Sequence, residues 1–497
     1  MSIWSIAYAD YELIVDRRSL TYQLTETKTQ TLWANDLPLG WIELEDRETA
    51  AVSRYDFGAL RCLSVSEKSG PQGKRILFGL DIHGIPIDLY LICSQREIQI
   101  QLEANRDSKT HRISAFGLLP GLCSVAEDTD GYRIVPFTQA TYLLSSNADS
   151  DRIYRNWEEL AMPFIGAVRK SAPGIQSALG LFTDSAYLDV SIHRQDIELI
   201  YRRDPERRRL DLRCLIFPQG DSLSIARAYR EKIIAENGHI TLRKKSRESI
   251  ALHDFLEGGV GDFIPVAHHL SPEDRTNRWE AMEERLSEIA QFHAQNQLIV
   301  LDRVQDWAAI AADGWLCETN VTDAQLTPAL QATLPLLATI YRDCVVPFAP
   351  LRHPFATQDL LRALIHLALP RIDSVPDGET MERGRDAVRL LKSAYHLTFS
   401  AFLTAHRFLT PDYKVEEAIY SDKTRVIINQ SESEIYETEE FSLPPLGFYM
   451  RHSQMEAHDA LRVGEERFAI RAWRIRQAQD GKSLESSEAV EWKVFPA

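Results

Sequence analysis

Three aspartates stand at positions suited to acid–base chemistry. Asp302 ends the apolar run LIVLD, Asp343 follows LLATIYR, and Asp262 lies in GGVGDFIPV. In α/β architectures, side chains at the carboxyl ends of the parallel strands form the active site. The glycines beside Asp262 permit close approach of backbone or ligand. These aspartates are our candidates for catalytic carboxyl groups.

Aromatic and polar side chains accompany these aspartates. Asp306 and Trp307 come just after LIVLD, Trp315 lies in the same loop region, and Arg342 precedes Asp343. Hydrolysis of a glycosidic bond needs two carboxyl groups, about 5–5.5 Å apart for retention or about 6.5–9.5 Å for inversion. Aromatic faces stack on sugar rings. The combination predicts a carbohydrate site in which the four neighbouring side chains contact the substrate.

A simpler interpretation stays open for each of these residues. Strand-end aspartates often cap a helix or pair with an arginine, and tryptophans often fill a core. His268 and His269 are adjacent, so they point in different directions, and no third metal ligand has a suitable spacing. The six cysteines form no C-x-x-C pair, and no glycine-rich nucleotide motif is present. No metal and no cofactor is therefore expected.

The charge balance excludes some partners. With 72 acidic and 56 basic residues the formal net charge is −16, and such a surface repels phosphate backbones and anionic lipids. Nucleic acid and membranes are not expected as partners, whereas neutral sugars are compatible with this charge. The N-terminal MSIWSIAYADYELIVDRR shows no secretory signal, so a cytoplasmic location is expected. The oligomeric state stays open.

The first half of the chain has the pattern of antiparallel strands. From Ser19 to about Ser114 apolar and polar residues alternate, for example in RILFGLDI and IDLYLICS on either side of His83-Gly84. The pattern resumes in AYLDVSIHR, DIELIYRR and LDLRCLIFP. Alternation of period two between turn residues is typical of antiparallel sheet. A large β-sandwich is predicted here.

Around Ser222 the apolar period changes to about 3.6. SLSIARAYREKIIAENG predicts a helix ending at Asn237-Gly238, and SPEDRTNRWEAMEERLSEIAQFHAQN predicts one that begins at Ser271. LIVLD, LPLLATIYRD and VVPF are expected as buried strands, and helices alternating with such strands indicate a parallel sheet or barrel. A long helix is expected from Glu379 to near Thr410, after which strand patterns return.

Three domains follow from these patterns, and the fold class is multidomain α+β. Residues 1–240 form a β-rich N-terminal domain, and residues 241–411 form a shortened α/β barrel-like domain. Residues 412–497 form a C-terminal antiparallel β-sandwich. A chain of 497 residues is too long for one hydrophobic core, which favours such a division.

Four stretches, in order along the chain, resemble one group of glycoside hydrolases, those related to the endo-α-N-acetylgalactosaminidases. They are ARAYREKIIAENGHITLRKK, NQLIVLDRVQDWAAI, LLATIYRDCVVPF and VIINQSESEIYETEEFSLPPLGFYMRH. The resemblance implies an N-terminal β-supersandwich, a central (β/α)8 barrel and a C-terminal β-sandwich. The position matching the family's acid/base glutamate is Asp302. Ile250 to Leu409 is too short for eight βα units, which typically need about 250 residues, so an incomplete barrel is expected.

The resemblance and the candidate residues lead to one main hypothesis about function. The chain is expected to act on an α-linked glycan or glycoconjugate by a two-carboxylate mechanism. Asp302 would be the acid/base, and Asp262 or Asp343 the second carboxylate. The alternative is a catalytically inactive homologue that binds carbohydrate or a protein partner. A third class, a scaffold protein that uses its sheets only for assembly, also stays open.

Overall fold

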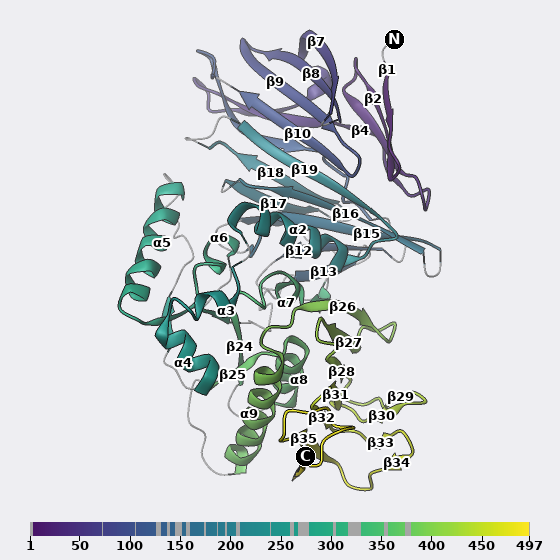
Figure 1. Cartoon of the computed structure of the whole chain (residues 1–497). Helices are drawn as coiled ribbons and strands as arrows, with labels where there is room; N and C mark the ends of the chain where they lie inside the picture. The colour runs from purple at the N-terminus through teal and green to yellow at the C-terminus, as the bar shows by residue number, and fades with distance from the viewer. Residues whose placement is uncertain are drawn as a thin grey trace. The chain divides into compact units, whose positions relative to one another are not determined.

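The computed structural model in Figure 1 describes most of the chain. The described residues are 3–71, 73–104, 106–125, 131–136, 140–144, 152–155, 160–172, 175–185, 187–193, 196–204, 209–238, 240–258, 263–266, 278–301, 305–316, 330–351, 356–372 and 379–496.

The chain folds into two compact units. Unit 1 comprises residues 1–229, 269–282 and 322–333, and unit 2 comprises residues 230–268, 283–321 and 334–497. The protein is mostly β and combines antiparallel sheets with one parallel α/β sheet, which confirms the α+β class at that level. The three predicted domain boundaries stay predictions.

Unit 1 is built from three sheets, in which every strand pair with a described register is antiparallel. The first sheet has the order β1 (Ile3–Ala7), β2 (Tyr11–Asp16), β3 (Thr21–Glu26), β4 (Leu32–Pro38). The second has the order β23 (Leu330–Leu334), β13 (Ala140–Leu144), β12 (Tyr132–Pro136), β15 (Phe164–Ala172), β16 (Ile175–Thr183), β19 (Arg209–Pro218), β10 (Glu97–Ala104), β9 (Ile85–Cys93), β8 (Gly73–Ile82), β7 (Arg61–Gly70). The third has the order β14 (Arg152–Arg155), β17 (Leu188–His193), β18 (Asp196–Arg202), β11 (His111–Leu118), β5 (Gly40–Asp46), β6 (Val52–Asp56), and a 3-10 turn, η1 (Phe57–Ala59), follows β6.

The alternating sequence pattern explains these strands. Along β9 every second side chain is buried, as expected of a strand with one face on a core. The β8–β9 hairpin turns at His83 and Gly84, whose φ angles are +52° and +76°. Two positive φ angles in succession are what a two-residue hairpin turn requires. The predicted hairpin is confirmed.

Helix α2 (Ser222–Asn237) contributes residues to both units. Asp221 accepts a hydrogen bond from the backbone N–H of Ser224 at 2.8 Å, which caps the helix. The helix ends before Gly238, whose φ is +75°, so the predicted stop is confirmed. Within unit 1, Tyr229 packs against Phe164 with ring centres 4.9 Å apart.

The centre of unit 2 is a five-stranded sheet in which every described pair of strands is parallel. Its order is β20 (Phe263–Val266), β21 (Leu298–Leu301), β22 (Gly314–Leu316), β24 (Val346–Leu351), β25 (Leu369–Ile372). The other described helices are α3 (Leu242–Lys245), α4 (Ile250–Gly258), α5 (Arg278–Ala294), α6 (Asp306–Ala309), α7 (Leu336–Ile340), α8 (Thr357–His366) and α9 (Glu379–Thr398). The expected α/β alternation is present.

Two predicted elements were wrong. LPLLATIYRD was expected to be a buried strand, but its five buried residues Leu336–Ile340 form helix α7. A short run buried on all sides has no periodicity that separates helix from strand. The long helix expected to reach Thr410 ends at Thr398, and Leu403–Phe408 forms strand β26, which pairs with the next strand, β27. Pairing with a neighbouring strand outweighs local helix preference there.

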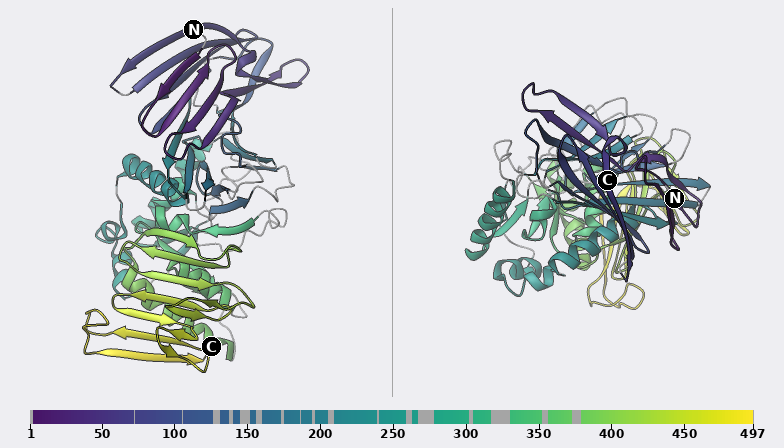
Figure 2. Two further views of the ribbon diagram at one scale, coloured as in Figure 1. Left: turned by 90° about the vertical axis from the view of Figure 1, so that its right-hand side faces the viewer. Right: turned by 90° about the horizontal axis from the view of Figure 1, so that it is seen from above.

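The C-terminal part of unit 2 is antiparallel. A seven-stranded sheet has the order β26 (Leu403–Phe408), β27 (Val415–Tyr420), β28 (Arg425–Asn429), β31 (Phe448–His452), β32 (Met455–His458), β35 (Ala472–Ala478), β36 (Val490–Pro496). A smaller sheet has the order β29 (Tyr436–Glu437), β30 (Phe441–Leu443), β33 (Arg462–Val463), β34 (Glu466–Arg467). Residues of both sheets, such as Ile427 and Phe441, share one core. The left view of Figure 2 shows the larger sheet, coloured green to yellow, with its strands side by side.

Candidate functional site

The parallel sheet of unit 2 brings the carboxyl ends of its strands to one edge. The register aligns Val266 of β20 with Leu301 of β21, and Leu301 with Trp315 of β22. Asp302 directly follows Leu301 in the sequence, and Asp262 directly precedes β20. Both aspartates lie outside the described residues, so their predicted catalytic roles stay predictions.

Asp306 and Trp307 are the first two residues of helix α6, which follows β21 after a short connection. Both side chains are partly exposed. The Asp306 carboxylate accepts a hydrogen bond from the backbone N–H of Trp307 at 2.9 Å. The indole N–H of Trp307 donates to the side-chain oxygen of buried Gln305 at 2.9 Å, which fixes the ring. A partly exposed carboxylate and a fixed aromatic ring therefore lie next to each other after a parallel strand.

Trp315 occupies a different environment. It is the middle residue of β22, is buried, and packs edge-on against Tyr341 with ring centres 6.0 Å apart. Burial raises the pKa of the Tyr341 hydroxyl well above its usual value, and the nearby charge of Asp306 adds to the effect. Trp315 fills the core in this arrangement, which is the simpler of its two interpretations. Neither Gln305 nor Tyr341 was singled out from the sequence, although Gln305 adjoins the predicted Asp306-Trp307 pair.

Arg342 is fully buried near the C-terminal end of the long helix α9. Its guanidinium donates to the backbone carbonyls of His366, Leu367, Thr398 and Ala401, and to the Thr398 hydroxyl at 3.0 Å. Burial lowers the pKa of Arg342 from its usual value. These carbonyls lie at the ends of α8 and α9, so Arg342 ties both helix ends together.

Asp343 follows helix α7 and precedes strand β24, so it does not end a strand as the sequence pattern suggested. Its two carboxylate oxygens accept hydrogen bonds from the two terminal nitrogens of Arg230, at 2.7 and 2.6 Å. The side chains are only 10% and 7% exposed. Burial acts to lower the pKa of Arg230, but the hydrogen bonds and charge of Asp343 outweigh it and the pKa rises. The contact is a buried, bidentate ion pair.

A second polar contact, which is partly buried, lies at the amino end of β22. Asp313, the residue before this strand, contacts the Nε2 atom of His293 at 2.8 Å and accepts the backbone N–H of Ile299 at 2.9 Å. In α/β folds this edge serves stability, whereas the opposite edge carries chemistry. No local sequence pattern marked this contact, because His293 belongs to α5 and Asp313 follows α6.

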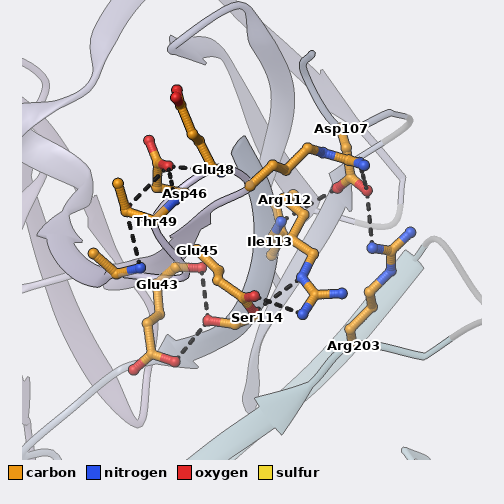
Figure 3. A network of polar contacts seen from close by, with 12 residues as sticks. Glu43, Glu45, Asp46, Glu48, Thr49, Asp107, Arg112, Ile113, Ser114 and Arg203 are labelled. Carbon is orange, nitrogen blue, oxygen red and sulfur yellow. Dashed lines mark hydrogen bonds and ion pairs between the residues drawn. The ribbon is translucent and has the colours of Figure 1, made fainter. Parts of the chain in front are cut away.

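Unit 1 carries a surface network of charges, drawn in Figure 3. Arg112 on β11 forms two hydrogen bonds with Glu45 on β5, at 2.9 and 2.6 Å, and the two residues are directly opposite in the register. Asp107 contacts the arginines Arg47 and Arg203 at 3.2 and 2.8 Å. Opposite charges on paired strands stabilise a sheet. The network stabilises the six-stranded sheet, and its carboxylates are engaged in these ion pairs.

Comparison with known proteins finds the fold among glycoside hydrolases. No family model matches the sequence, and no curated protein matches it either. The α-N-acetylgalactosaminidase NagBb of Bifidobacterium bifidum is similar in structure, in its complex with GalNAc (TM-score 0.65) and with Gal-NHAc-DNJ (TM-score 0.66). In both comparisons the identity is 11%, and the match covers 86% of this chain and 98% of NagBb. A β-arabinopyranosidase matches with a TM-score of 0.41 and 7% identity, and the match covers 99% of this chain and 98% of that protein.

The likeness to NagBb defines the class of fold. It extends over most of both chains, so the protein has a glycosidase-like architecture, and the resemblance in sequence is confirmed at that level alone. At 11% identity it shows the fold alone. Among the described helices, none is long and apolar enough to cross a membrane.

Proposed function

We propose that the protein binds and hydrolyses an α-linked glycan or glycoconjugate at the carboxyl edge of the parallel sheet. The observation that carries the proposal is the partly exposed Asp306-Trp307 pair at the start of α6, a short connection after β21. The glycosidase-like architecture supports it, and NagBb is an α-N-acetylgalactosaminidase. The net charge of −16 suits a neutral sugar better than an anionic ligand.

Asp302 acts as the acid/base in this proposal. In its protonated form it donates a proton to the oxygen of the leaving group, and as a carboxylate it later removes one from water. Its place in the sequence, directly after the last residue of a buried parallel strand, supports this role.

The second carboxyl group comes from Asp306 or Asp262. Asp306 follows the same strand as Asp302, and a separation of four residues spans at most about 14 Å, which includes the distances that hydrolysis needs. The described residue after Asp262 is Phe263, the first residue of β20, which pairs with the first residue of β21. That position is at the amino edge, so we favour Asp306. Trp307 supplies the aromatic surface for the sugar ring.

Arg342 and Asp343 have structural roles in this proposal. Asp343 neutralises Arg230, and Arg342 binds the carbonyls at the ends of α8 and α9. The carboxylate of Asp343 and the guanidinium of Arg342 are thus both engaged in contacts within the protein. Both residues precede β24, whose first residue lies at the amino edge of the sheet.

Hydrolysis of a panel of α- and β-linked p-nitrophenyl glycosides tests the proposal. Asp302→Asn is expected to lower kcat by about 100- to 10,000-fold, the usual contribution of a general acid. Trp307→Ala is expected to raise KM or weaken glycan binding several-fold, because it removes the stacking surface. Asp254→Asn is the control, since Asp254 is an exposed acid on α4 of the same unit. Full activity of Asp302→Asn on a substrate that the wild type cleaves would exclude the acid/base role.

The alternative function is carbohydrate binding without hydrolysis. It is favoured by the aspartate at position 302, because the resembling enzymes carry a glutamate there and an aspartate reaches less far by one methylene. A displacement of about 1 Å in a catalytic group costs on the order of 100-fold in rate. A wild-type protein that cleaves no glycoside but binds glycans through Trp307 would establish this function instead.

A further inference from the structure

Strand β36 is the last strand of the seven-stranded sheet, and its side chains are unusually exposed. It pairs with β35 and contacts helix α9, and among the described strands the sheet order places nothing beyond it. Trp492 and Val494 are 55% and 61% exposed. Glu491 and Lys493 are 46% and 47% exposed and contact each other at 3.1 Å. An apolar edge strand of this kind is a template for pairing with another chain.

The sequence of β36 is complementary to itself when read in the opposite direction. Residues 490–494 are Val-Glu-Trp-Lys-Val. If two copies pair antiparallel about a two-fold axis at Trp492, each tryptophan faces its counterpart. Glu491 of each copy then lies opposite Lys493 of the other, and Val490 lies opposite Val494. Every directly opposed pair is therefore either apolar or of opposite charge, and both kinds stabilise paired strands.

The surroundings of Trp492 fit such a contact. Arg476, directly opposite Trp492 on β35, lies with its guanidinium 5.4 Å from the ring centre. The charge of Arg476 is already balanced by Glu456 at 2.9 Å, so covering the tryptophan leaves this arginine paired. Val490, Trp492 and Val494 lie on one face because side chains alternate along a strand. In the dimer, the three apolar side chains of each copy would therefore form one continuous row across the two-fold axis.

We propose that a second copy of this chain binds at β36, in antiparallel register centred on Trp492, to form a two-fold symmetric dimer. The contact joins two seven-stranded sheets into one continuous sheet. A two-fold contact uses the same surface on both copies, so it closes and does not propagate into a fibre. Charge complementarity between Glu491 and Lys493 of the two copies fixes the register.

Analytical ultracentrifugation of the full chain over a concentration series tests this proposal. The wild type is expected to dimerise. Lys493→Glu places like charges opposite each other twice, and the dimer Kd is expected to rise at least about tenfold. The exchange Glu491→Lys with Lys493→Glu restores both attractive pairs and is expected to restore the dimer. Circular dichroism and thermal melting verify that each variant folds as the wild type does.

Disulfide cross-linking tests the register independently, in a Cys62→Ser background because Cys62 is exposed. Trp492→Cys is expected to form a covalent dimer, since directly opposite Cβ atoms lie about 4.5–5.5 Å apart. Val494→Cys is the matched control and is expected not to cross-link, because its opposite residue is Val490. A wild type that stays monomeric at 100 μM overturns the proposal. A dimer unaffected by Lys493→Glu, or equal cross-linking of both cysteine variants, also overturns it.

Discussion

Replacing Asp343 by asparagine separates a structural role from a catalytic one. Asp343→Asn keeps the size of the side chain but removes the charge that neutralises Arg230, whose two terminal nitrogens donate to it at 2.7 and 2.6 Å. Both side chains are buried. Arg230 also donates to the backbone carbonyl of Ile340 at 2.6 Å and lies over the ring of Phe402, so it is held in place and cannot turn towards water.

The expected effect is large and concerns stability. Removing one partner of a buried ion pair costs roughly 3–5 kcal/mol, because the remaining charge is left uncompensated. For a cooperative unit of 150–250 residues, each kcal/mol lowers Tm by about 2–4 °C, so the expected fall is about 6–20 °C. The double variant Arg230→Met with Asp343→Leu is the control. It replaces the pair by apolar side chains and is expected to lose less than about 2 kcal/mol, since such replacements are often neutral.

Urea unfolding and activity on the cleaved substrate are measured in parallel. We expect Asp343→Asn to lose stability while kcat below its melting temperature changes little, because Asp343 is assigned no contact with substrate. A variant that unfolds within about 1 kcal/mol of the wild type would refute the ion-pair reasoning. Loss of kcat at unchanged stability would return Asp343 to the list of catalytic carboxylates.

Two further predictions concern the buried polar groups of unit 2. Arg342→Met removes the donor to the Ala401 carbonyl and one of the two donors to the Thr398 carbonyl, and is expected to lower the free energy of unfolding by roughly 3 kcal/mol, measured by urea denaturation; an unchanged midpoint would contradict the bridging role. Burial, followed by the charges of His406 and Arg342, lowers the pKa of His366 to about 3, so its neutral form stabilises the fold fully above pH 6.5. As the pH falls from 6.5 towards 3, this contribution is lost, and the free energy of unfolding is expected to fall by as much as ~1.4 kcal/mol per pH unit. Denaturation at pH 6.5, 5.5 and 4.5 should therefore show a shallower pH dependence for His366→Leu; equal slopes would contradict this.

The strands and caps were predictable where local chemistry decides the structure. The His83-Gly84 turn and the stop at Gly238 need positive φ angles, and glycine signals such positions in a sequence. The buried segments were harder. Leu336–Ile340 is buried on every side, so its pattern does not distinguish helix α7 from a strand, and the expected position of Asp343 at a strand end was wrong for the same reason.

The candidate site was predictable only as a set of residue types. The sequence marks Asp306 and Trp307 as neighbours of a buried run, and the structure places both at the start of α6, a short connection after β21. It does not mark the partner of Asp343, because Arg230 lies on α2, more than a hundred residues away. Whether an acid pairs with an arginine or faces a ligand depends on such distant contacts.

The order of the segments along the chain also affects how the protein is made. Unit 1 is not continuous in the sequence: the ten-stranded sheet receives its terminal strand β23 beside β13, although β20, β21 and β22 of unit 2 are synthesised between them. At 5–20 residues per second the ribosome needs roughly 10–40 s to reach β23 after completing β13. During that interval β13 is an open edge on the nascent chain. Completion of the ten-stranded sheet therefore has to wait for a segment that is made after three strands of the parallel sheet.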